Sequence, residues 1–152
     1  MNKNIKVAKE LIKLAKSLIN KNIIISSKQT NYDIIKKIAE QIRNEMVKKY
    51  GTGDKLSGHC IEASDLIIEE LKKHNISSKS PEGYVLLDDT SGWEYPYASH
   101  VWVEASGYFI DVTIEQFNDY LKLTDKPFPP ICIFKTRPKN VVMKKPAYNE
   151  ST

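Results

Sequence analysis

The sequence predicts an α+β fold, with helices in its first half and strands in its second. Apolar residues recur at helical spacing as far as residue 75, and short runs rich in β-branched and aromatic residues follow from residue 83. A length of 152 residues fits one domain with a hydrophobic core. The hydrophobic content of 41% and charged content of 28% are ordinary for a soluble globular protein. We therefore expect N-terminal helices, with a later helix packed on an antiparallel sheet.

Residues 1–20 are predicted to form a basic amphipathic helix. Its apolar side chains are Ile5, Ala8, Leu11, Ile12, Ala15, Leu18 and Ile19, opposite Lys3, Lys6, Lys9, Lys13 and Lys16. Such a helix can pack on the domain, lie on an anionic membrane surface, or dock into a protein partner. Because it has no Trp or Phe to anchor it in lipid, the domain or a protein partner is favoured over a membrane.

A polar connector is predicted at residues 21–30, a domain at residues 31–146 and a polar tail at residues 147–152. The domain would begin with a second helix that runs from about Asn31 to Tyr50. The apolar line of this helix is Ile34, Ile35, Ile38, Ile42, Met46 and Val47. A loop with two glycines, Gly51 to Asp54, would end it.

The next helix is predicted between Leu56 and Asn75, with Ser57 or Gly58 as its cap. Its apolar face is Ala63, Ile67, Ile68 and Leu71. Cys60 falls in the first turn, where unpaired N–H groups and the positive end of the helix dipole stabilise an anion. The position therefore favours a thiolate, the form that a cysteine nucleophile requires.

Two strand-like runs later in the chain form a predicted hairpin around the turn Ser106-Gly107. This turn sets Glu104 opposite Phe109 and His100 opposite Thr113. His100 and Asp111 would then be diagonal neighbours on one face, about 5–8 Å apart at their Cβ atoms. From there a carboxylate can orient an imidazole, so the hairpin supplies a His–Asp pair to the thiol.

The remaining elements are shorter. A strand is predicted from Gly83 to Asp88, and an irregular loop with Trp93, Tyr95 and Tyr97 follows it. A short helical segment is expected at Thr113 to Leu123, and strands at Ile131 to Phe134 and Val141 to Met143. Cys132 is interpreted as a small buried residue. A disulfide between Cys60 and Cys132 would abolish the nucleophile, so we expect a reducing compartment.

These motifs, in this order, resemble the transglutaminase-like branch of the papain-like cysteine hydrolases. The residues that carry the resemblance are Gly58 to Ser64, the glycine-led strand at Gly83, His100 to Glu104, and Tyr108 to Thr113. The run from Ile110 to Phe117 is similar to that of uncharacterised bacterial and phage-encoded members, and the resemblance covers about Ser57 to Phe117. It implies a papain-like fold, with Cys60 as the nucleophile, His100 as the general base and acid, and Asp111 as the orienting carboxylate. Papain has a glutamine before its cysteine that helps to form the oxyanion hole, whereas this chain has Asp54 and Lys55 in that region.

Further residues are candidates for substrate or oxyanion binding: His59, Trp93, Trp102 and Gln116, with Glu104 as another polar candidate. His59 can instead flank the site, and the aromatic residues of the loop can instead cover the sheet edge. A zinc site made of Cys60, His59, His100 and Asp111 has suitable residue types. Its spacing matches no standard ligand pattern, so we predict neither a metal nor a cofactor.

The net charge of +4 is unevenly distributed. Residues 1–50 carry 12 basic and 4 acidic side chains, residues 51–125 carry 5 and 14, and residues 126–152 carry 6 and 1. The acidic middle part favours a cationic substrate, unless the basic flanks neutralise it by packing nearby. Only two arginines are present, without a stacking platform of aromatic residues, so nucleic acid is not an expected partner. No signal peptide or membrane span is visible, which favours the cytoplasm.

The sequence thus predicts a cysteine-dependent acyl-transfer enzyme, either a peptidase, an amidase or deamidase, or a transglutaminase-like transferase. Its substrate would be a peptide, a protein or an amine. The alternative is a catalytically inactive papain-like domain that binds a partner through its basic N-terminal helix, in a phage-associated setting.

Overall fold

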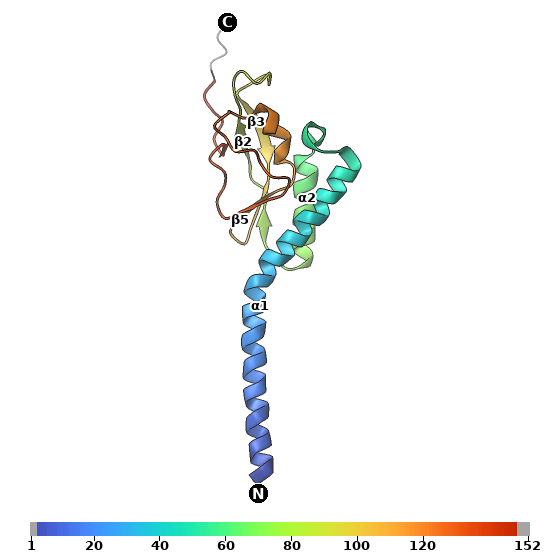
Figure 1. Cartoon of the computed structure of the whole chain (residues 1–152), viewed down its shortest axis with the longest axis vertical. Helices are drawn as coiled ribbons and strands as arrows, with labels where there is room; N and C mark the ends of the chain where they lie inside the picture. The colour runs from blue at the N-terminus through green and yellow to red at the C-terminus, as the bar shows by residue number, and fades with distance from the viewer. Residues whose placement is uncertain (1–2, 149–152) are drawn as a thin grey trace. The chain divides into compact units, whose positions relative to one another are not determined.

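A computed structural model describes residues 3–148, with the side chains of residues 20–30 left aside. The residues of the predicted polar tail from 149 onward lie outside the described residues. The fold is α+β, with antiparallel sheets in the second half of the chain (Figure 1). The predicted fold class is confirmed at this level.

Helix α1, Lys3–Tyr50, runs through the segment that we predicted to be a connector. We expected two helices joined by a non-helical connector at residues 21–30. This expectation is wrong, because the backbone of these residues is helical. Residues 3–50 contain no glycine or proline, so no residue in the segment is a strong helix breaker. The chain nevertheless divides into two compact units within this helix, the first ending at Ile34 and the second beginning at Ile35.

Residues 3–19 of the first unit keep their apolar side chains exposed. Every side chain from Lys3 to Ile19 is exposed, and Leu11 and Leu18 each retain 61% of their accessible surface. These leucines and the neighbouring isoleucines form the apolar face that the sequence predicted. Over the described residues, no helix has the length and apolarity needed to cross a bilayer.

In the second unit, two helices bury one face each. Residues 35–50 of α1 bury Ile35, Ile38, Ala39, Ile42 and Met46. Helix α2, Cys60–Lys73, buries Ala63, Ser64, Ile67 and Leu71. It ends as predicted, because Asn75 has a positive φ of 57° and its N–H donates to the carbonyl of Lys72. Figure 1 shows α2 beside this part of α1 and close to the strands.

The strands form two antiparallel sheets. The first has the order β1-β4-β5-β6, made of β1 (Ser78–Lys79), β4 (Val103–Ala105), β5 (Tyr108–Asp111) and β6 (Cys132–Phe134). The second has the order β3-β2-β7, made of β3 (Tyr97–Val101), β2 (Glu82–Leu86) and β7 (Val141–Val142). The predicted hairpin register is confirmed where β4 pairs with β5, because Glu104 lies opposite Phe109.

The predicted continuous strand from His100 to Glu104 is wrong, because it is divided at Trp102. Residues before Trp102 belong to β3 and residues after it to β4, in different sheets. His100 consequently pairs with Gly83 of β2, whereas we expected it opposite Thr113.

Trp102, where the predicted strand divides, packs closely on Gly83. The Trp102 ring is completely buried and lies over Gly83, where an added Cβ would be 2.6 Å from Cη2 of the ring. The same Cβ would be 2.4 Å from the backbone oxygen of Val142. Glycine is therefore required at this position by close packing on two sides.

In the described part of the chain, two 3-10 helices complete the fold. A 3-10 helix, η1 (Gly53–Leu56), precedes α2, and a second, η2 (Ile114–Tyr120), follows β5. The core contains Val85, Leu87, Ala98, Trp102, Phe109, Ile114, Phe117, Phe128, Cys132 and Val141. Since η2 begins three residues after Asp111 and packs in this core, it holds the end of β5 in place.

Candidate active site

Cys60 is the first residue of α2, as the sequence predicted. The cap is His59, not Ser57 or Gly58 as expected, and its side chain makes no capping hydrogen bond. Gly58 has a φ of 82°, which places it in the turn before the cap. The start of the helix is held from the side, where the His59 ring stacks on Tyr50 at 3.5 Å between centroids.

Glu62 joins this contact from the first turn of α2. Its carboxylate accepts a hydrogen bond of 2.5 Å from the Tyr50 hydroxyl and one of 2.7 Å from Lys49 Nζ. The pKa of Glu62 is lowered, chiefly by the hydrogen bond from Lys49. These groups fix the end of α1 to the start of α2, and so they position the backbone that carries Cys60.

His100 and Asp111 are in direct contact, although they come from strands of different sheets. Nε2 of His100 lies 2.5 Å from Oδ2 of Asp111, and both side chains are buried. The proximity that the sequence predicted is thus present. The Asp111 carboxylate holds Nε2, which leaves Nδ1 as the nitrogen available to another group.

The other oxygen of Asp111 accepts hydrogen bonds from the chain that follows it. Oδ1 lies 2.9 Å from the backbone nitrogens of Thr113 and Ile114. The same stretch is tied to α1, because Arg43 donates to the backbone oxygen of Val112 at 2.9 Å and pairs with Glu115. The carboxylate is therefore fixed by the backbone on one side and presented to His100 on the other.

The thiol and the imidazole shift each other's pKa. Burial acts to raise the pKa of Cys60, but the nearby His100 side chain and its positive charge, with a backbone contact at Val101, lower it overall. Burial acts to lower the pKa of His100, but Asp111 and then Cys60 raise it to about 9. The ion pair of thiolate and imidazolium is consequently favoured at a lower pH than an ordinary thiol would allow.

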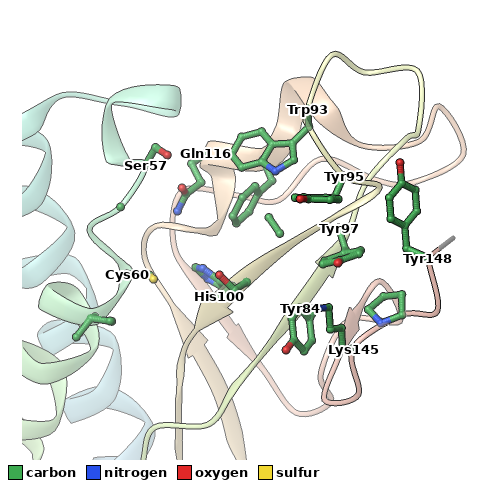
Figure 2. Close-up of a pocket in the computed structure, with 16 residues that line it drawn as sticks. Ser57, Cys60, Tyr84, Trp93, Tyr95, Tyr97, His100, Gln116, Lys145 and Tyr148 are labelled. Atoms are coloured by element: carbon green, nitrogen blue, oxygen red, sulfur yellow. The ribbon is translucent and has the colours of Figure 1, made fainter. Parts of the chain in front are cut away.

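A pocket of about 1090 Å³ opens beside these two groups. Figure 2 shows Cys60 at the edge of the pocket that α2 forms, with His100 next to it and Gln116 above. The lining residues are Ser57, Gly58, Cys60, Ile61, Tyr84, Trp93, Tyr95, Tyr97, Ala98, Ser99, His100, Gln116, Phe117, Lys145, Pro146 and Tyr148. The thiol thus faces a space large enough for a peptide or an acyl group.

The structure brings some of the predicted binding residues to this pocket and not others. Trp93 and Gln116 line it. Trp102 is in the hydrophobic core, and His59 is held against Tyr50 and Glu62. Glu104 lines a separate cavity of about 400 Å³ and pairs with Lys79 there.

Several residues of the site were not predicted. Tyr84, Lys145 and Tyr148 line the pocket from β2 and from the C-terminal segment, and sequence spacing gives no signal for contacts of that kind. For Arg43 the sequence does give a signal, because this residue occurs at helical spacing on the apolar face of α1. A buried arginine on such a face indicates a buried partner, here Glu115.

The two cysteines are both free, and they differ in their surroundings. Cys132 is buried and its pKa is raised, chiefly by burial, whereas Cys60 is half-buried with a lowered pKa. Among the side chains that the structure describes, no group of three or more His, Cys, Asp or Glu residues could hold a metal ion. Cys60 is thus the more reactive of the two thiols.

Comparisons with known proteins identified no relative of this chain. No protein-family model, no curated protein and no solved structure matches the chain.

Proposed function

We propose that this protein is a cysteine-dependent acyl-transfer enzyme with a papain-like, transglutaminase-like fold. Cys60 is the nucleophile, His100 the general base and acid, and Asp111 the residue that orients His100. The reaction is attack on an amide or thioester carbonyl, as in peptidases, amidases, deamidases and transglutaminase-like transferases.

The observation that carries the proposal is the environment of the His100 ring. Nε2 is held by Asp111, while Nδ1 is buried and makes no hydrogen bond of ordinary geometry with the described residues. The thiol of Cys60 is close enough to His100 for each to shift the pKa of the other. A buried nitrogen without a structural partner is costly, and it is accounted for if its role is to exchange a proton with the thiol and the substrate.

In the first step, the Cys60 thiolate forms a bond to the carbonyl carbon, and the carbonyl electrons move to oxygen. When the tetrahedral intermediate collapses, the bond to the leaving amine or thiol breaks, and Nδ1–H of His100 gives that group its proton. Water or an acceptor amine then attacks the thioester, and Nδ1 takes its proton. The thiolate leaves again, so the enzyme is restored after one acyl group has been transferred.

In the proposed mechanism, two donors stabilise the oxyanion. One is the backbone N–H of Cys60, since the first N–H groups of a helix have no partner within it. The other is Gln116, which lines the pocket and already donates through Nε2 to the carbonyl of Thr113 at 3.1 Å. An amide nitrogen has two N–H groups, so one remains for the oxyanion.

A panel of acyl donors tests the proposal. Peptide amides, glutamine peptides and aryl thioesters would be offered with and without an added amine. We expect turnover of at least one class and an acyl adduct on Cys60 in intact-mass spectra, with both lost in Cys60→Ala. Cys132→Ala is the matched control, and it should retain the adduct because Cys132 is buried in the core.

Products formed without amine indicate hydrolysis, and products formed only with amine indicate transfer. If no donor class produces an adduct, the inactive binding domain becomes the better description. The exposed apolar side chains of residues 3–19 would then be the region to examine for partner binding.

A further inference from the structure

We propose that Tyr95 and Tyr97 form a subsite for an aromatic side chain of a peptide substrate, and that Tyr148 of this chain occupies the subsite in the structure. This inference rests on the proposed function, because the subsite belongs to the same pocket as Cys60. The substrate class would be peptides with an aromatic residue away from the carbonyl that reacts.

The two tyrosines form a stacked pair, which we call the platform. Their rings stack at 5.5 Å between centroids with an angle of 19° between planes. Tyr84 supports the platform by an edge contact of 5.7 Å with Tyr97. Aromatic side chains attract further rings in edge-to-face geometry, so a platform of this kind is suited to an aromatic group.

Tyr148 makes that type of contact with both rings. Its centroid lies 5.6 Å from that of Tyr95 at 87°, and 6.4 Å from that of Tyr97 at 77°. Tyr148 retains 44% of its accessible surface, so it can be displaced without opening the core. The occupant is itself a piece of peptide, which indicates how a peptide substrate would bind.

The charge of the pocket indicates which peptides it would bind. Among the residues that the structure describes, its lining contains no Asp or Glu, although residues 51–125 as a whole are acidic. Lys145 lines it instead, with Nζ 5.8 Å from the centroid of the Tyr97 ring. The lining therefore favours a neutral or acidic peptide, and not the cationic substrate that the overall charge suggested.

The subsite is separated from the reacting sulfur. Figure 2 shows Tyr95, Tyr97 and Tyr148 at the end of the pocket away from Cys60, with His100 between the two regions. An extended peptide would thus reach from the thiol past His100 to the tyrosines. Occupation of the platform by Tyr148 competes with the part of the peptide that binds there.

Peptide binding tests the subsite without catalysis, in protein that carries Cys60→Ala. Acetyl-Pro-Ala-Tyr-amide and acetyl-Pro-Ala-Ala-amide would be titrated, with NMR shifts as the readout. We expect the tyrosine peptide to bind about 3- to 10-fold more tightly. Adding Tyr148→Ala should tighten its binding by about 3-fold or more, because the resident side chain no longer occupies the platform.

Tyr97→Leu should remove the preference for the tyrosine peptide while the volume of the side chain is largely kept. Tyr108→Ala is the control, since Tyr108 lines the separate cavity, and it should leave both affinities unchanged. Equal binding of the two peptides, or no effect of Tyr148→Ala, overturns the subsite. Because this assay needs no turnover, its failure is distinguishable from failure of the acyl-donor panel.

Discussion

Replacing His100 by Ala is expected to reduce the rate of acyl transfer by about 10³-fold. In the proposed mechanism, the variant lacks the group that protonates the leaving group and deprotonates the acceptor. It also loses the main interactions that lower the pKa of Cys60, while burial, which raises that pKa, remains. The measurement is turnover at pH 7 of the best donor from the panel, with protein concentration corrected for the folded fraction.

The matched control is His74→Ala, which removes an exposed histidine at the other end of α2. Its turnover should remain within about 2-fold of that of the unchanged protein, since surface substitutions of this kind change stability by only a few tenths of a kcal/mol. If His100→Ala also kept most of its turnover, His100 would not be the base, and the role given to Asp111 would lose its basis.

Replacing Gly83 by Ala is expected to destabilise the fold by about 3 kcal/mol. The added methyl group would lie 2.4 Å from the Val142 oxygen and 2.6 Å from the Trp102 ring. Neither neighbour can move easily, because one is backbone in β7 and the other is fully buried. Chemical denaturation followed by far-UV circular dichroism measures the change.

Gly107→Ala gives the comparison. Gly107 has a φ of 79° in the β4–β5 turn, and an added Cβ there meets no atom within 4 Å. We expect Gly107→Ala to lower the free energy of unfolding by about 1 kcal/mol, because only the left-handed backbone conformation is unfavourable for alanine there. A loss at Gly83 no greater than the loss at Gly107 would show that Trp102 and β7 yield to the methyl group.

Local patterns in the sequence were sufficient to predict the helix at Cys60 and the pairing of β4 with β5. Asn75 ends α2 in the left-handed conformation that its short side chain tolerates, and Ser106-Gly107 sets the register of the hairpin. These two features depend on residues a few positions apart, which spacing arguments can address. The contact of His100 with Asp111 was predicted from a continuous hairpin, and it is present although the two residues belong to strands of different sheets.

Features that depend on distant residues could not be predicted. Trp102, which separates β3 from β4, packs over Gly83, nineteen positions earlier. The platform of Tyr95 and Tyr97 is covered by Tyr148, some fifty positions later. The continuity of α1 was missed for another reason, since a polar stretch without glycine or proline was interpreted as a connector.

The most direct test of the central claim is the rate of Cys60 alkylation by iodoacetamide as a function of pH. The imidazolium of His100 persists up to a pKa of about 9, so the thiolate should already form below the ordinary thiol value. We predict a midpoint below the ordinary thiol pKa in the unchanged protein, a shift to higher pH in His100→Ala, and little reaction in Cys60→Ala. The same midpoint at or above an ordinary thiol pKa in both proteins that retain Cys60 would contradict the account.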